Sequence, residues 1–129
     1  TKMAGKIVMG TVEGDLHEIG KTLVWTLLTA NGFQVMDIGV DKKADDFIAA
    51  IKEFDADIVG ASALLTTTML QQKKLVQALE GAGLRNKVKV LVGGAPVTET
   101  FAKEIGADGY AEDAISAVDM AFRLIDAPA

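Results

Sequence analysis

The chain has 129 residues and contains one histidine, His17, and no cysteine. Asp15 precedes this histidine by two positions and Gly20 follows it by three. A carboxylate this close can accept a hydrogen bond from one imidazole nitrogen, which fixes the tautomer and leaves the other nitrogen able to bind a metal. One histidine cannot form a zinc site, because that site needs three or four protein ligands. The residue types therefore favour one axial ligand to a metal already held by a macrocycle.

Two other readings of this segment compete with a metal ligand. A lone histidine in a globular domain is by default a solvated or hydrogen-bonded structural residue. Residues 14–22 (GDLHEIGKT) also approach the phosphate-loop pattern, which requires glycine, four residues and then Gly-Lys-Ser/Thr. Here five residues separate Gly14 from Gly20, and an aspartate inside such a loop would repel a phosphate. The segment therefore argues against nucleotide binding. Two interpretations of His17 stay open, a metal ligand and a structural histidine.

Two further segments carry residue types suited to a ligand slot. Residues 62–69 (SALLTTTM) combine apolar and hydroxyl side chains without a charge, which suits a large, weakly polar ligand. Thr66 or Thr67 could instead cap a helix. Gly93 and Gly94 would let a ligand lie against bare backbone, although a tight turn alone also explains adjacent glycines. Each segment taken alone is therefore ambiguous.

Strands and helices must alternate to position these residues. Short apolar runs predict strands, and apolar residues at every third or fourth position predict helices, with Leu23, Trp25 and Leu70 among the expected core residues. The predicted strands are residues 6–11, 33–39, 57–62, 88–93 and 109–111, and the predicted helices are residues 18–30, 45–54, 67–81, 98–105 and 114–125. Thr98 is the expected N-cap of the fourth helix. Continuous apolar strands joined by helices indicate a parallel sheet covered on both faces.

The predicted fold is thus α/β, a five-stranded, doubly wound, Rossmann/flavodoxin-like sheet with helices on both faces. In such sheets, ligands bind beyond the carboxyl ends of the strands, near the point where the strand order reverses. The histidine segment, the hydroxyl segment and the paired glycines all follow predicted strands. We therefore expect them to meet at one edge of the sheet, beside a long ligand.

Composition excludes several classes of function. With 13 basic and 18 acidic residues the net charge is −5, which repels a phosphate backbone, and 5% aromatic residues provide no stacking surface. Nucleic-acid binding is therefore not expected. No apolar run approaches the length of a membrane span, and we expect neither a membrane-spanning helix nor a signal peptide. The absence of cysteine excludes disulfides and thiolate metal sites, and a cytoplasmic location fits this composition.

The motif Asp15-x-His17-x-x-Gly20, followed by Ser62-x-Leu64 and Gly93-Gly94, resembles the three-part signature of cobalamin-binding domains that take the cofactor base-off and histidine-on. The parts stand in the family's order and near its spacing. Residues 10–15 and 62–69 are similar to the corrinoid proteins of methyltransferase systems and to the related module of methionine synthase. The resemblance implies one cobalamin-binding domain over residues 1–129, without the helical cap that normally precedes it.

The resemblance also implies roles for individual residues. His17 would replace the cofactor's dimethylbenzimidazole as the lower cobalt ligand, Asp15 would hydrogen-bond the imidazole, and Thr68 would extend this relay. Ser62 and Leu64 would line the slot for the displaced nucleotide tail, with Thr66 nearby. Gly93 and Gly94 would let the tail pass, and Ala114 matches a position that contacts it. Glu18 stands where aspartate is common in the family. The expected cofactor-binding residues are Gly14, Asp15, Leu16, His17, Glu18, Ile19, Gly20, Ser62, Leu64, Thr66, Thr68, Gly93, Gly94 and Ala114, with His17 as the metal ligand.

By resemblance, the chain is expected to be a corrinoid methyl carrier and not an enzyme by itself. It would carry a methyl group on cobalt from a substrate-specific corrinoid methyltransferase to a second methyltransferase, whose acceptor is a compound such as tetrahydrofolate or coenzyme M. A reductive activase is a third expected partner. The alternatives are the cobalamin module of an adenosylcobalamin-dependent mutase and a metal-free receiver-like module. The receiver needs acidic residues where this chain has Thr11 and Ser62.

Overall fold

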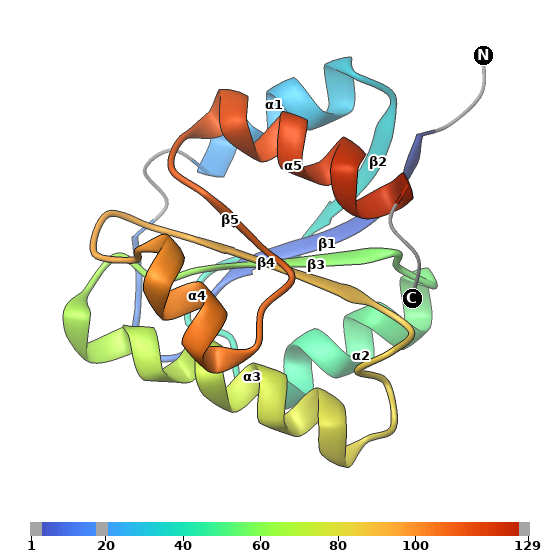
Figure 1. Cartoon of the computed structure of the whole chain (residues 1–129). Helices are drawn as coiled ribbons and strands as arrows, with labels where there is room; N and C mark the ends of the chain where they lie inside the picture. The colour runs from blue at the N-terminus through green and yellow to red at the C-terminus, as the bar shows by residue number, and fades with distance from the viewer. Residues whose placement is uncertain (1–3, 18–20, 127–129) are drawn as a thin grey trace.

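One parallel sheet organises the protein. The computed structural model describes residues 4–17 and 21–126, and within them five strands pair in the order β2-β1-β3-β4-β5 (Figure 1). The strands are β1 (Gly5–Thr11), β2 (Phe33–Asp37), β3 (Ile58–Ser62), β4 (Lys89–Gly93) and β5 (Gly109–Ala111). The chain runs outward from β1 first to β2 and then, in the other direction, to β3. The strand order therefore reverses between β1 and β3, where such sheets bind their ligands.

Helices cover both faces of this sheet. In Figure 1, α1 and α5 lie on one face, and α2, α3 and α4 lie on the other. The helices are α1 (Lys21–Ala30), α2 (Ala44–Phe54), α3 (Met69–Gly81), α4 (Glu99–Ile105) and α5 (Ala114–Asp126), with a 3₁₀ turn η1 (Thr66–Thr68) just before α3. Each crossover returns the chain to the start of the next parallel strand, which places the carboxyl ends of all strands at one edge.

Two apolar cores hold the layers together. Along β3, Ile58 packs on the side of α1 and α5, whereas Val59 and Ala61 pack on the side of α2, α3 and α4. Because successive side chains of a strand point to opposite faces, a strand between two cores must be apolar at every position. This explains why the strands of this chain are continuous apolar runs.

The predicted doubly wound fold is confirmed, and each predicted strand and helix is present within a few residues of its expected bounds. The predicted start of the first helix, at residues 18–20, lies outside the described residues. Thr98 is the N-cap of α4, since its hydroxyl accepts a hydrogen bond from the Phe101 backbone N–H at 3.1 Å. None of the described helices is long and apolar enough to cross a membrane.

Three core assignments and one cap assignment were wrong. Leu23, Trp25 and Leu70 are 56%, 40% and 58% exposed. Leu23 lines a groove instead of the core, and the inward position near Leu70 is taken by the fully buried Gln72. Neither Thr66 nor Thr67 caps α3, because the chain enters this helix through η1.

Candidate functional site

Asp15 is the centre of a hydrogen-bonded cluster at the carboxyl end of β1. Its Oδ1 lies 2.8 Å from Nδ1 of His17, and the same oxygen accepts a hydrogen bond from the His17 backbone N–H at 3.1 Å. Its Oδ2 accepts hydrogen bonds from the Leu64 backbone N–H at 2.6 Å and from the Thr68 hydroxyl at 2.7 Å. The Asp15 side chain is fully buried, whereas that of His17 is 46% exposed. With Nδ1 held by the carboxylate, Nε2 is the nitrogen left for a ligand.

The loop that carries His17 is fixed by the loop after β2. Backbone hydrogen bonds join Thr11 N to Gly39 O at 2.9 Å and Asp41 N to Asp15 O at 2.9 Å. The Asp41 carboxylate accepts a hydrogen bond from Gly14 N at 2.8 Å, and Gly14 has a φ of 84°, which suits glycine. The Thr11 hydroxyl donates to the His17 carbonyl at 3.1 Å. These contacts hold the imidazole in place without burying it.

Hydrogen bonding keeps Asp15 ionised despite its burial. Burial raises the pKa of Asp15, but the hydrogen bonds from Leu64 N–H, the Thr68 hydroxyl and His17 outweigh it and lower this pKa from 3.8 to about 2. The carboxylate is therefore charged at neutral pH. A charged carboxylate beside Nδ1 favours the tautomer in which Nδ1 carries the proton and Nε2 has a free lone pair.

This lowered pKa makes the stability of the protein depend on pH. In the unfolded chain Asp15 regains its ordinary pKa, so its stabilising contribution is complete above about pH 4 and is lost as the pH falls towards 2. We expect Asp15→Asn to remove about 2 kcal/mol of this pH-dependent stability. The measurement is urea unfolding of the apoprotein at several pH values between 7 and 2. Asp119→Asn, at an exposed position of α5, is the matched control. An equal loss of stability on acidification in Asp15→Asn and in the wild type would contradict the assignment.

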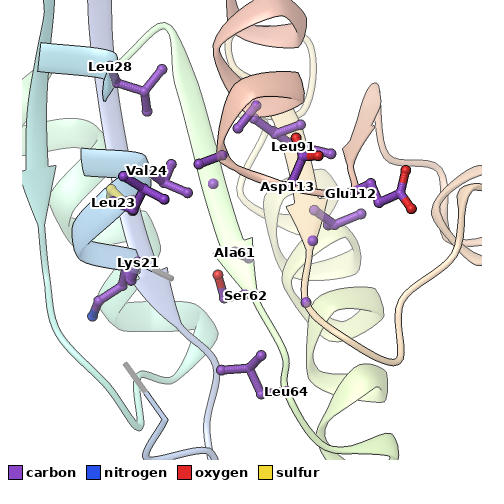
Figure 2. A pocket seen from close by; sticks show the side chains of 18 of the residues that line it. Lys21, Leu23, Val24, Leu28, Ala61, Ser62, Leu64, Leu91, Glu112 and Asp113 are labelled. Atoms are coloured by element: carbon purple, nitrogen blue, oxygen red, sulfur yellow. The ribbon is translucent and has the colours of Figure 1, made fainter. Parts of the chain in front are cut away.

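A groove of about 410 Å³ lies on the face of the sheet that α1 and α5 cover (Figure 2). Figure 2 shows Val24 and Leu28 of α1 on one side of β3 and Leu91 of β4 on the other. The sheet register places Met9, Gly60 and Leu91 side by side across the floor of the groove. Because Gly60 has no side chain, the floor is hollow between its two larger neighbours. The predicted tail-binding residues that line the groove are Ser62, Leu64, Gly93, Gly94 and Ala114.

The structure gives the paired glycines a packing role as well. Gly94 has a φ of 127°, and a Cβ built on it would overlap the backbone carbonyl of Ala63. A Cβ on Gly93 would lie 2.9 Å from the carbonyl oxygen of Ala111. Both positions therefore require glycine even without a ligand.

The predicted site residues fall into two adjoining groups. Asp15, His17 and Thr68 form the hydrogen-bonded cluster, and the groove begins beside them. Leu64 joins the two groups, because its backbone N–H binds Asp15 while the residue lines the groove. Thr66 is exposed and belongs to neither group, and Leu16 is exposed next to His17. The predicted residues Glu18, Ile19 and Gly20 lie outside the described residues.

Sequence reasoning missed Gln72 and Lys21. Gln72 is fully buried, and its Nε2 donates to the carbonyls of Ala61 at 2.8 Å and Gly93 at 3.1 Å, which ties the ends of β3 and β4 together. A polar residue in a helix normally predicts exposure, so no local pattern marks Gln72 as buried. Lys21 is buried at the start of α1, and its ammonium lies 3.0 Å from Asp37. No local pattern predicts this long-range ion pair.

The described side chains at the carboxyl edge of the sheet offer one nitrogen ligand, from His17. This suits a metal whose other ligands come from a cofactor. Within residues 4–17 and 21–126, no cluster of three or more His, Asp or Glu side chains could hold a metal ion. His17 offers one nitrogen ligand, and the adjoining groove has the volume of a small-molecule site.

Comparison with known proteins gives one consistent result. The family model described as B12 binding domain matches residues 5–119. A dimethylamine corrinoid protein of Methanosarcina acetivorans is 53% identical over 124 residues, which are 96% of this chain and 58% of that protein. The solved structure of the Methanosarcina barkeri monomethylamine corrinoid protein is 43% identical with a TM-score of 0.88, covering 94% of this chain and 58% of that one. The methanol:cobalamin methyltransferase complex of Methanosarcina barkeri contains a chain that is 35% identical with a TM-score of 0.88. The match covers 96% of the present chain and 47% of that one. The chain therefore spans about half the length of these relatives.

Proposed function

This chain belongs to the B12-binding domain family, and on that premise we propose that it binds cobalamin base-off and histidine-on and carries a methyl group on the cobalt. The observation that carries the proposal is the position of one oriented imidazole next to an apolar groove, with Leu64 shared between them. An imidazole alone is a common structural feature. An imidazole held by a buried carboxylate beside an apolar groove suits a cofactor with a metal and a tail.

The residues present fit the cofactor in two respects. The groove of about 410 Å³ is lined mainly by apolar side chains, which suits the aromatic base of the displaced tail. His17 Nε2 is the remaining ring nitrogen, which suits the lower ligand position. We assign the tail to the groove beside Ser62, Leu64, Gly93, Gly94 and Ala114. Gly14 and Leu16 belong to the loop that presents His17, and we propose Glu18, Ile19 and Gly20 as further cofactor-binding residues.

Bound cobalamin supplies a cobalt centre that accepts and donates methyl groups. The chain contributes the control of its lower ligand. Asp15 holds the proton at His17 Nδ1, and Thr68 donates a hydrogen bond to the other oxygen of the same carboxylate. A change in the proton shared by Asp15 and His17 alters the basicity of Nε2, so the cluster adjusts how strongly the imidazole binds cobalt.

The proposed partners follow from the carrier role. A substrate-specific corrinoid methyltransferase would load the methyl group, a second methyltransferase would pass it to an acceptor such as coenzyme M or tetrahydrofolate, and a reductive activase would restore the reduced cofactor. The relatives named for methylated amines favour an amine as the methyl source. We propose that the chain works in the cytoplasm as a carrier and is not an enzyme by itself.

The test has a binding step and a transfer step. The purified chain is incubated with hydroxocobalamin and desalted, and its absorption spectrum is recorded. The loaded protein is then reduced, treated with isotopically labelled methyl iodide and mixed with coenzyme M and a corrinoid:coenzyme M methyltransferase. We expect a coloured protein and labelled methyl-coenzyme M. A colourless protein would overturn cobalamin binding, and a coloured protein that transfers no label would overturn the carrier role alone.

A further inference from the structure

We propose that the inner end of the groove selects among cobamides by the base of their nucleotide tail, and that Gly60 sets the room for that base. Cobamides share the corrin ring but differ in this base, which can be a benzimidazole, a phenol or a purine. The inference rests on the proposed function and adds a ligand preference to it.

The inner end of the groove is apolar. We define it by Ile7, Val24, Leu28, Leu91 and Ala117, all of which line the groove. The strand register puts Ile7 and Leu91 farther from the carboxyl edge than Ser62, and Figure 2 shows Leu28 and Leu64 at opposite ends of the groove. The inner end therefore provides no side-chain hydrogen-bond partner for a base.

The polar side chains among the described lining residues lie elsewhere or are engaged. Ser62 ends β3, and Glu112 and Asp113 follow β5, so all three are near the carboxyl edge. The Asp113 carboxylate accepts hydrogen bonds from the backbone N–H and hydroxyl of Ser116 at 2.8 Å each. Lys21 pairs with Asp37 on β2. A base at the inner end therefore meets no side-chain hydrogen-bond partner among these residues.

Gly60 differs from the other strand glycines. A Cβ built on Gly5, Gly10, Gly93 or Gly109 would meet another heavy atom within 3.0 Å, so at each of these positions a neighbour would have to move to admit a side chain. A Cβ on Gly60 would meet only Met9 Cβ at 3.7 Å and the Val8 carbonyl oxygen at 4.0 Å, which are ordinary contacts. Glycine weakens the interior of a strand. Packing in the described residues gives no reason for glycine at this position, but the hollow in the groove floor does.

The chemistry of the base then sets the order of affinity. A phenolic base has no ring nitrogen, a benzimidazole has one nitrogen that would lack a partner, and adenine has several ring nitrogens and an amino group. Each polar group buried without a partner weakens binding. We expect p-cresolyl cobamide to bind most tightly, cobalamin next, and adeninyl cobamide at least about tenfold more weakly than the p-cresolyl form.

The experiment measures the dissociation constants of these three cobamides and of cobinamide, which lacks the base, by equilibrium dialysis with the full chain. The variants are Gly60→Ala and Gly60→Val, with Gly81→Ala as the control, because nothing lies within 4 Å of a Cβ at that helix position. We expect Gly60→Val to weaken the binding of p-cresolyl cobamide and cobalamin by at least about tenfold and to leave that of cobinamide unchanged. Gly60→Ala should show a smaller loss, and it carries the test if the valine variant does not fold.

The outcomes separate the two claims. Equal affinity for the adeninyl and p-cresolyl forms would overturn the selection, and unchanged cobalamin binding by both Gly60 variants would overturn the role of Gly60. Either result leaves the proposed function standing. If the wild-type chain binds none of the four corrinoids, the proposed function itself fails.

Discussion

Replacement of His17 by alanine is expected to weaken cobalamin binding by at least about 10- to 100-fold and to give bound cofactor a spectrum without histidine ligation. His17 supplies the proposed lower ligand, and no other described residue offers an imidazole. The side chain is 46% exposed, so its removal leaves both cores intact. The measurement is a titration with hydroxocobalamin, followed by the absorption spectrum of the desalted protein.

Gln77→Ala, at an exposed position on α3, serves as the control and should bind cobalamin as the wild type does. Circular dichroism of both variants checks that the fold is retained. If His17→Ala bound cobalamin with wild-type affinity and an unchanged spectrum, His17 would be a structural residue, and the proposed ligation would be wrong.

Replacement of Gly94 by alanine is expected to destabilise the protein by about 3 kcal/mol or more, enough to unfold much of a marginally stable domain. Gly94 has a φ of 127°, which L side chains rarely adopt, and its Cβ would overlap the backbone of Ala63. Because the obstacle is backbone, no side chain can move away to relieve it. Urea unfolding monitored by circular dichroism gives the change in the free energy of unfolding.

Gly81→Ala is the matched control, since Gly81 has an ordinary φ and open space around it. Alanine is a better helix former, so this variant should be unchanged or slightly more stable. A Gly94→Ala protein as stable as the wild type would show that the close approach to Ala63 does not determine this position. Glycine there would then be explained by the ligand alone.

Most of the fold could be predicted because periodicity is a local property. Apolar runs and helical spacing gave the order of the elements, and the parallel sheet followed from the alternation of strands and helices. Periodicity cannot show what an apolar helix face meets. Leu23 lies on the expected face of α1, but this face borders a groove there, so the residue is exposed.

The site could be predicted only in part. Asp15 and His17 are two residues apart, so their hydrogen bond followed from the spacing. The bond from Thr68 spans 53 residues and was expected only from the family resemblance. Gln72 is a polar residue in a helix, a pattern that predicts exposure, but the carbonyls of Ala61 and Gly93 provide partners that are visible only in the folded chain. The importance of Gly60 likewise depends on the contacts its Cβ would make.

The central claim is that His17 binds cobalt in place of the cofactor's own base. The chain has one histidine, so growth with ¹⁵N-histidine labels His17 alone. The measurement is the electron paramagnetic resonance spectrum of the chain loaded with cob(II)alamin, with labelled and with unlabelled protein. We predict that the nitrogen splitting on the cobalt lines changes from a triplet in the unlabelled protein to a doublet in the labelled one. A triplet in both samples would show that the dimethylbenzimidazole remains bound, and would contradict the account.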